Sequence, residues 1–323
     1  MTAMKRYTGV ALLMAGIVAL CAAVTAFTGV RAQKSEEPQA HGNLRVVCSF
    51  YPVYVAALNV CDGVKGVELS SLTGPTAGCL HDYQLSPDNR ITLSEADLLV
   101  INGAGAESFL DQTLAQLPEL SVVDTSQGVS LLESGAAHEH VHEDGDHEDG
   151  EDHSHEAVNE HIWTSPSRYR RQVENLRDGL CAADPVHAQA YRDNATAYLA
   201  RIDDAAQELE QAAQELPARS CITFHDSLAY FAQELGITVL YSLHIGEESG
   251  VSASDVAAAE QAAKAAGDAL LLYDSQYPVQ YEYIGGKGGV TLTLDMAVSG
   301  EAGKDAWLTA MRRNAAALRA AAG

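Results

Sequence analysis

The stretch SCITFHDSLAYFAQELGITVLYS, residues 220–242, contains two short apolar, β-branched runs with a helical pattern between them. Residues 220–224 and 238–242 predict strands, and residues 228–235 predict the helix that connects them. Strands joined through a helix run parallel, and a parallel sheet is covered by helices on both faces. This stretch therefore predicts an α/β fold with a parallel sheet.

The same alternation of strand and helix patterns occurs in both halves of the chain. Strands are predicted at 44–48, 67–72, 97–101 and 120–124, and again at 220–224, 238–242, 269–273 and 290–294. Helices or helical turns are predicted at 54–60, 87–95, 106–117, 228–235, 254–266 and 304–322. Between the halves, Ser165 and Pro166 form a helix start, which predicts a helix over 166–183 and a second long one over 185–216. We expect two similar α/β lobes joined by helix.

The N-terminal segment has the pattern of an export signal. Lys5 and Arg6 precede an uncharged, mostly apolar run over residues 9–30, which predicts a signal peptide or membrane anchor over residues 1–32. Cys21 invites a lipoprotein interpretation, but the large Leu20 before it disfavours one. We expect the folded part to lie outside the cytoplasmic membrane. The predicted domains are a tether at 33–43, a first lobe at 44–165, a linking helix at 166–184 and a second lobe at 185–323.

Composition narrows the function further. The chain has 323 residues, 47% of them hydrophobic, and a formal net charge of −24. A charge of this sign repels nucleic acid and is compatible with attracting cations. Five cysteines follow the export segment, so at least one thiol stays free outside the cell, where disulfides are permitted. Cys61 could pair with Cys79, and Cys48 and Cys221 are expected to be buried free thiols.

Residues 138–156 read HEHVHEDGDHEDGEDHSHE. A tract this polar cannot bury enough surface to offset the entropy of ordering it, so we predict a disordered loop. Neutral imidazole binds zinc, copper and nickel, which predicts weaker, accessory metal sites here rather than a solvated acidic linker. The six candidate accessory ligands are His138, His140, His142, His147, His153 and His155.

Ligands of open parallel α/β sheets bind outside the carboxyl ends of the strands. His81 follows the second predicted strand, His225 and Asp295 stand directly after predicted strands, and His161 lies between the acidic loop and the linking helix. Taken alone, a histidine after a strand is more often a helix cap or a surface residue than a ligand, and Asp295 could simply cap a turn. Together, three imidazoles and one carboxylate form a tetrahedral set suited to zinc, and a filled set favours capture over catalysis.

Several motifs carry a family resemblance. They are Phe50-Tyr51-Pro52, His81-Asp82-Tyr83 with Pro87, Ala96-Asp97-Leu98, Asn102 to Glu107, His161-Ile162-Trp163 before Ser165-Pro166, Phe224 to Phe231, and Thr293-Leu294-Asp295. In this order, across roughly residues 44–318, they resemble the cluster A-I metal solute-binding proteins of ABC importers. The resemblance implies two Rossmann-like lobes bridged by a long rigid helix, with the metal ion between them. Histidine at position 225 and the acidic loop are typical of the zinc-specific branch.

The chain also departs from the family pattern. Glu160 precedes His161, and Met296-Ala297 follows Asp295 in place of proline-leucine. The fourth ligand is therefore Asp295, a water molecule or a loop carboxylate. Glu107 and Asp274 are weaker candidates, expected to hydrogen-bond to ligands or to cap local structure.

The expected function is capture of Zn²⁺, the transported ligand, and its delivery to the permease of an ABC importer. We expect a monomer that associates with the membrane through its N-terminus or the permease, binds no nucleic acid and is not an enzyme. Two alternatives come from other classes. One is a secreted zinc hydrolase, against which the lack of a clear general base beside a predicted ligand argues, and the other is a surface metal sensor or adhesin without transport.

Overall fold

The computed structural model describes residues 43–75, 78, 80, 83–134, 158–243, 252–267, 269–276 and 290–323. Residues 43–323 form one compact unit. The predicted export segment at 1–32, most of the tether, the acidic loop at 138–156 and His81 lie outside the described residues. No helix within the described ranges is long and apolar enough to cross a membrane.

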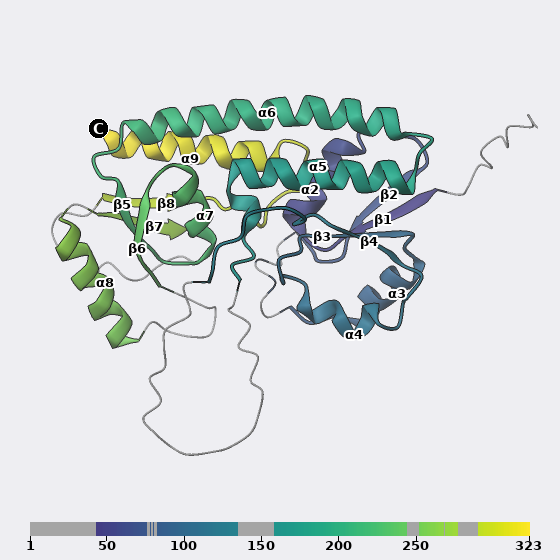
Figure 1. The fold of residues 1–323 in the computed structure, drawn as a ribbon, viewed down its shortest axis with the longest axis horizontal. Coiled ribbons are helices and arrows are strands. Elements are labelled where there is room, and N and C mark those ends of the chain that lie inside the picture. The colour runs from purple at the N-terminus through teal and green to yellow at the C-terminus, as the bar shows by residue number, and fades with distance from the viewer. Residues whose placement is uncertain are drawn as a thin grey trace, which may run out of the picture. The chain divides into compact units, whose positions relative to one another are not determined.

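The first sheet contains four parallel strands in the order β2-β1-β3-β4 (Figure 1). Its strands are β1 (Leu44–Cys48), β2 (Val67–Ser71), β3 (Leu98–Ile101) and β4 (Ser121–Asp124), and its helices are α2 (Tyr51–Val60), α3 (Pro87–Glu95) and the short α4 (Asp111–Leu114). Val46 and Val47 point to opposite faces of β1 and both are buried. Burial on both faces is what a sheet covered by helices requires, which explains the β-branched run.

The second sheet repeats this topology, with the order β6-β5-β7-β8. Its strands are β5 (Ser220–Thr223), β6 (Thr238–Ser242), β7 (Leu270–Asp274) and β8 (Val290–Leu294), and its helices are α7 (Ser227–Glu234), α8 (Ala253–Ala266) and α9 (Ala306–Ala322). Every residue of β7 is buried. The two lobes of the expected α/β fold therefore share one strand order, which places the carboxyl ends of β1 and β5 in equivalent positions.

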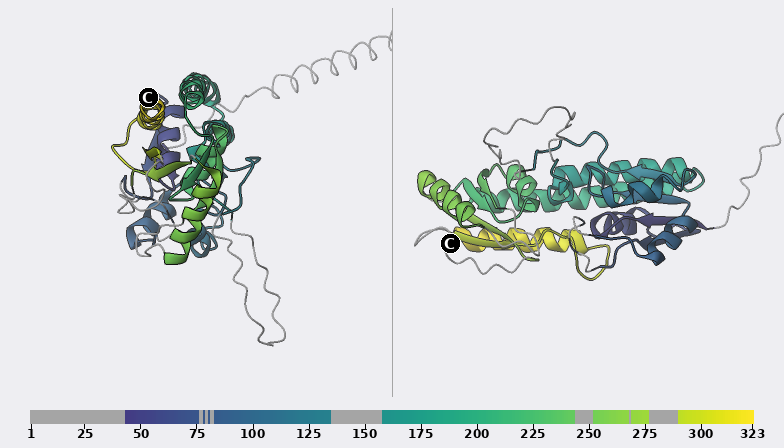
Figure 2. Two further views of the ribbon diagram at one scale, coloured as in Figure 1. Left: turned by 90° about the vertical axis from the view of Figure 1, so that its left-hand side faces the viewer. Right: turned by 90° about the horizontal axis from the view of Figure 1, so that it is seen from below.

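Two long antiparallel helices lie along the lobes (Figures 1 and 2). They are α5 (Pro166–Ala183) and the 27-residue α6 (Ala188–Gln214), which also packs against α2 and α9. Asn194, near the start of α6, donates from its side-chain amide to the carbonyl groups of Val60 and Asp62 in the first lobe. Farther along, Leu209 is fully buried. Helix α6 thus contacts elements of both lobes.

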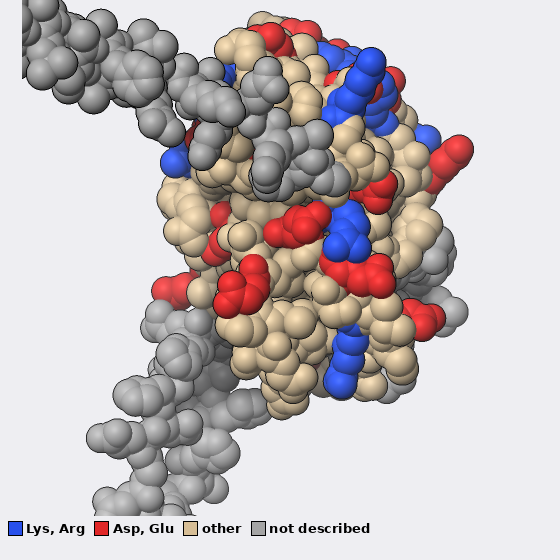
Figure 3. Space-filling view, turned by 90° about the vertical axis from the view of Figure 1, so that its right-hand side faces the viewer, with Lys and Arg blue, Asp and Glu red and all other residues tan. Residues whose placement is uncertain are grey.

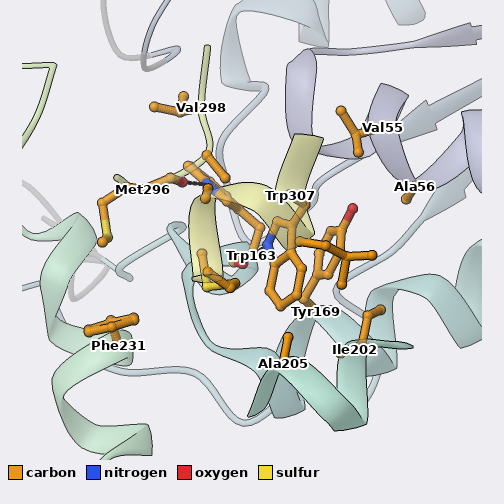
Figure 4. Close-up of a cluster of buried hydrophobic side chains, with 14 of the residues drawn as sticks. Val55, Ala56, Trp163, Tyr169, Ile202, Ala205, Phe231, Met296, Val298 and Trp307 are labelled. Atoms are coloured by element: carbon orange, nitrogen blue, oxygen red, sulfur yellow. Dashed lines mark hydrogen bonds between the residues drawn. The ribbon is translucent and has the colours of Figure 1, made fainter. Parts of the chain in front are cut away.

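An aromatic cluster fixes the segment that follows His161 (Figure 4). Trp163 donates from Nε1 to the carbonyl of Met296 at 2.9 Å, and Trp307 donates from Nε1 to the carbonyl of Trp163 at 2.9 Å. Tyr169 stacks on Trp307 with ring centroids 4.4 Å apart, and Phe50 of the first lobe meets Trp163 edge to face. Both indole N–H groups are therefore paired in a buried core that joins the two lobes.

Acidic and basic side chains lie among one another on the face shown in Figure 3. Ion pairs of the described residues include Lys304 with Asp62 at 2.7 Å and Arg45 with Asp97 at 3.7 Å, and both of these are solvent-exposed. Exposed pairs of this kind contribute little to stability. The fold is held mainly by its buried apolar side chains.

Five predicted elements match the structure residue for residue, namely β1, α3, α5, β6 and β8. The helices or helical turns predicted over 106–117 are a 3₁₀ turn at Ser108–Leu110 followed by the short helix α4. Residues 103–105 have φ angles of 79°, 54° and 87°, in the left-handed region, so no helix continues through them. A Cβ on Gly103 would stand 1.9 Å from Asp124 Oδ1, which requires glycine at this position.

One smaller expectation changes. The long helix expected from residue 185 begins at Ala188, because Asp184 accepts hydrogen bonds from His187 Nδ1 and from the hydroxyl of Tyr191 and so closes a turn there. Cys61 is buried and forms no disulfide with a described cysteine, and Cys79, its possible partner, lies outside the described residues. Cys48 and Cys221 are buried free thiols, as expected.

Candidate metal centre

Two of the predicted ligands lie together. His225 stands just beyond β5, and His161 lies at the 3₁₀ turn Ile162–Thr164 that leads into α5. Their imidazole rings meet edge to face, with centroids 5.1 Å apart and an interplanar angle of 84°. His161 is 1% exposed and His225 is 2% exposed. Two nitrogens bound to one tetrahedral zinc ion lie about 3.3 Å apart, a separation that rings this close can reach.

His161 is held by the residues before it. Asn159 Oδ1 accepts hydrogen bonds from the backbone N–H of His161 at 3.0 Å and from ring Nδ1 at 2.9 Å. One residue along, the carbonyl of Glu160 accepts a hydrogen bond from Asn102 Nδ2 at 2.9 Å. Asn102 follows β3, so the first lobe fixes the peptide that carries His161.

His225 is held by the start of α7. The backbone N–H of Ser227 donates to His225 Nδ1 at 3.1 Å, and the Ser227 hydroxyl donates to Asp274 Oδ2 at 2.9 Å. In this arrangement the neutral ring of His225 carries its proton on Nε2. A metal ion bound through Nε2 therefore requires that proton to leave or to move to Nδ1, at the expense of the Ser227 hydrogen bond.

Asp274, expected to support the ligands, lies at the carboxyl end of β7 and is buried. Besides the Ser227 hydroxyl, it accepts a hydrogen bond from the backbone N–H of Gln276 at 3.0 Å. Burial raises the pKa of Asp274 to about 6, and the negative charge of Asp295 adds to this shift. In the described residues, Asp274 braces the turn that positions His225.

In the first lobe, Glu107 holds a turn near the site in the way that Asp274 does in the second lobe. Its carboxylate accepts hydrogen bonds from the Ser49 hydroxyl at 2.7 Å and from the backbone N–H groups of Asn102 and Gly103 at 2.8 and 3.1 Å. Burial raises the pKa of Glu107 to about 7, although these hydrogen bonds act in the opposite direction. Glu107 ties the ends of β1 and β3 together and thereby fixes Asn102.

Asp295 directly follows β8, as the sequence predicts, and its carboxylate already has partners. Oδ1 accepts a hydrogen bond from the backbone N–H of Ala297 at 2.9 Å, and Oδ2 lies 3.4 Å from Arg313 Nη1. Asn314 bonds both the N–H and the carbonyl of Asp295. A metal ion bound by Asp295 would share this carboxylate with Arg313, so its role as fourth ligand stays a prediction.

The described residues that flank the acidic loop in sequence are joined beside this centre. The Tyr230 hydroxyl donates to the carbonyl of Asn159 at 2.6 Å and accepts from the backbone N–H of Leu132 at 2.8 Å. Asn159 in turn donates its backbone N–H to the carbonyl of Leu132 at 2.9 Å, and Glu133 forms an antiparallel bridge with Val158. We call residues 132–134 and 158–159 the loop stem.

The loop stem also borders an open pocket of about 510 Å³, which it shares with α7 and β6. Asp226 is part of its lining, and its carboxylate accepts hydrogen bonds from the hydroxyl groups of Ser134 and Ser242 at 2.6 and 2.9 Å. No role was predicted from the sequence for Asn159, Asp226 or Tyr230. Asp226 and Tyr230 lie within the family motif from Phe224 to Phe231, whereas the only signal for Asn159 was a polar side chain near His161.

Among the described residues, no group of three or more histidine, cysteine, aspartate or glutamate side chains is close enough to hold a metal ion. His81 and the six histidines of the acidic loop are not among the described residues. The donor set that the structure does describe, two adjacent buried imidazoles, is the kind that zinc takes.

Comparison with known proteins identifies the family. The family model described as the periplasmic component A of the zinc-uptake complex matches residues 46–321. The chain belongs to this family. Among its relatives, the zinc-binding protein AdcA of Streptococcus pyogenes is 26% identical over 319 residues, which cover 94% of this chain. The high-affinity zinc uptake system protein ZnuA of Bacillus subtilis is 24% identical over 250 residues and covers 77% of this chain and 76% of its own length.

The fold agrees with this family. A crystal structure of ZnuA superposes with a TM-score of 0.67 at 25% identity and covers 87% of this chain and 99% of its own. A zinc-bound deletion mutant of ZnuA superposes with a TM-score of 0.65, also at 25% identity, over 86% of this chain and 96% of its own. The prediction of two parallel-sheet lobes with flanking helices is confirmed. The chain spans 61% of the length of the streptococcal AdcA.

Proposed function

We propose that the protein captures Zn²⁺ outside the cytoplasmic membrane and delivers it to the permease of an ABC importer. The observation that carries this function is the pair of buried imidazoles, His161 and His225, 5.1 Å apart beside the carboxyl end of β5 in a chain of the zinc-uptake component family. At this site the zinc ion is the transported ligand and not a resident cofactor.

The proposed ligand set is His81, His161, His225 and Asp295. The two histidines of the described part lie in the second lobe and at the start of the helices that connect the lobes. The loop stem, joined by Tyr230, lies directly beside them. This placement supports an accessory role for the loop histidines, which would collect zinc near the selective site.

The protein is proposed to act as a monomer, held at the membrane by its N-terminus or by the permease, and to bind no nucleic acid. Its relatives are zinc-binding proteins and uptake components. They give no support to the alternatives of a secreted hydrolase or of a sensor or adhesin, and we propose that the chain is not an enzyme.

Calorimetric titration with Zn²⁺ tests the proposal. The variant His225→Ala removes one imidazole, and we expect it to lose tight binding while the wild-type protein keeps one tight site. His187→Ala is a matched control, because His187 is partly exposed and bonded to Asp184 at the turn before α6. Unchanged zinc affinity in His225→Ala, or equal losses in both variants, would contradict this site.

A further inference from the structure

The side chain of Asn159 forms three hydrogen bonds next to the candidate metal centre. It is 1% exposed. Its Oδ1 accepts from the backbone N–H and from ring Nδ1 of His161, at 3.0 and 2.9 Å. Its Nδ2 donates to the carbonyl of Asp226 at 2.9 Å. One amide thus contacts a predicted ligand on one side and the residue after another predicted ligand, His225, on the other.

Only one orientation of the Asn159 amide is compatible with these neighbours. If oxygen and nitrogen exchanged places, the NH₂ group would face the backbone N–H of His161, a second donor, and the oxygen would face the carbonyl of Asp226, a second acceptor. Both buried contacts would become repulsive. The oxygen therefore faces His161.

This orientation decides where the proton of His161 resides. A carbonyl oxygen cannot donate, so Nδ1 of His161 must be the donor of the 2.9 Å hydrogen bond. In a neutral imidazole the other nitrogen, Nε2, then carries the lone pair, and a lone pair is what a metal ion binds. The hydrogen bond made by one ring nitrogen selects the nitrogen that is left to ligate.

We propose that Asn159 is a positioning residue for zinc binding: it holds His161 in the Nδ1–H tautomer, so that Nε2 ligates, and fixes the spacing of His161 and His225 through the carbonyl of Asp226. This inference deepens the proposed function and rests on it. Asn159 itself does not touch the metal ion.

The backbone of Asn159 is fixed as firmly as its side chain. Its carbonyl accepts the Tyr230 hydroxyl at 2.6 Å, and its N–H donates to the carbonyl of Leu132 at 2.9 Å. Four partners from three segments therefore leave the amide little freedom to turn. Asn159 is also the last residue of the loop stem. One residue therefore positions His161 and joins the loop stem.

The variants Asn159→Leu and Asn159→Asp separate the parts of this arrangement. Leucine has a similar shape and removes every side-chain hydrogen bond. Aspartate keeps an oxygen for His161 and loses the donor to Asp226. Zinc affinity is measured by competition with a chromophoric chelator, and the tautomer of His161 is measured on the zinc-free protein by ¹⁵N NMR of labelled histidine.

We expect wild-type His161 to show a protonated Nδ1 and an unprotonated Nε2. Asn159→Leu should lose this preference and bind zinc about 10- to 100-fold more weakly, the range for lost partners of metal-ligating histidines. Asn159→Asp should keep the tautomer and bind more tightly than the leucine variant. Asn175→Leu is the control: it also loses two amide hydrogen bonds, to the carbonyl groups of Thr125 and Gln127, and should change neither measurement.

Three results would overturn the inference. The first is an unchanged His161 tautomer in Asn159→Leu, even if the zinc affinity or thermal stability of that variant falls. The second is a zinc affinity of Asn159→Leu within twofold of wild type, and the third is an Nε2–H tautomer of His161 in Asn159→Asp. The last result decides the matter if the leucine variant fails to fold. Failure of the wild-type protein to bind zinc would instead contradict the proposed function, and the tautomer of the zinc-free protein would still test the role of Asn159.

Discussion

The imidazole rings of His161 and His225 meet edge to face with their centroids 5.1 Å apart. His225 follows the central strand β5 of the second lobe, whereas His161 belongs to the segment that the first lobe fixes through Asn102. A metal ion bound by both would therefore connect structure from both lobes. Binding a ligand only in the folded state also stabilises that state, so zinc should raise the melting temperature.

Deletion of residues 138–156 should remove weak zinc sites and leave one tight site. The loop stem at 132–134 and 158–159 is kept by this deletion, and its hydrogen bonds to Tyr230 do not depend on the loop. The stoichiometry and affinity of zinc binding by calorimetry provide the measurement. Disappearance of the tight site would mean that the loop supplies an essential ligand.

Tyr230→Phe should loosen the loop stem. The variant removes the hydroxyl that bonds both Leu132 and Asn159, at 2.8 and 2.6 Å, and leaves their backbone groups without this partner. We expect a loss of about 1–3 kcal/mol in the free energy of unfolding and faster amide exchange at Leu132.

Tyr241→Phe is the control for this experiment, because its hydroxyl bonds Asp255 at 3.2 Å, away from the stem. Leu132 should exchange at the wild-type rate in this variant. Slow exchange of Leu132 in Tyr230→Phe would show that the stem is held by other contacts.

Trp163→Ala should be strongly destabilising. Trp163 is buried between Phe50 and the segment of Met296, and its loss leaves a large cavity and an unpaired Met296 carbonyl. We expect a cost of about 3–5 kcal/mol in the free energy of unfolding, measured by denaturant titration. Ile91→Ala, at an exposed position of α3, should stay within about 0.5 kcal/mol of wild type. A small cost for Trp163→Ala would contradict the role given to the aromatic cluster.

Glu107 should make stability depend on pH between about 4.5 and 7. Its pKa is raised from 4.5 to about 7 by burial, so the folded state binds its proton more tightly than the unfolded state. The contribution of this group is fully favourable below the unfolded pKa and is lost as the pH rises through the folded pKa, by about 3 kcal/mol in total.

The control is Glu107→Gln, which cannot titrate. The difference in unfolding free energy, wild type minus variant, should decrease as the pH rises from 5 to 8. A constant offset between the two proteins is expected, because the amide of glutamine cannot accept from all of Ser49, Asn102 and Gly103. A difference that does not change with pH would show that Glu107 is ionised at its ordinary pKa in the folded protein.

Much of the fold follows from local sequence. Ser165 caps α5 with its hydroxyl and is followed by proline, and the helix starts where this pair predicts. Helix α3, predicted at 87–95, is capped by the Ser86 hydroxyl in the same way. Strand β7 was recognisable as a buried apolar run. These signals are local, since a cap or a strand pattern is complete within a few residues.

The failures have tertiary causes. The helical pattern over 106–117 could not show which part forms only turns. The carboxylate of Glu107 bonds to residues after β1 and β3, and the left-handed residues 103–105 precede it. The contribution of Asn159 was also invisible, because its partners Asp226 and Tyr230 come from a distant part of the chain. Contacts of this kind exist only once both lobes have folded.

The most direct test of the central claim is a crystal structure of the zinc-loaded protein with anomalous scattering measured on both sides of the zinc edge. We predict one strong anomalous peak about 2.0–2.1 Å from a ring nitrogen of both His161 and His225, with Nε2 as the ligating nitrogen of His161. A strong peak elsewhere, with neither His161 nor His225 bound to the metal ion, would contradict the account.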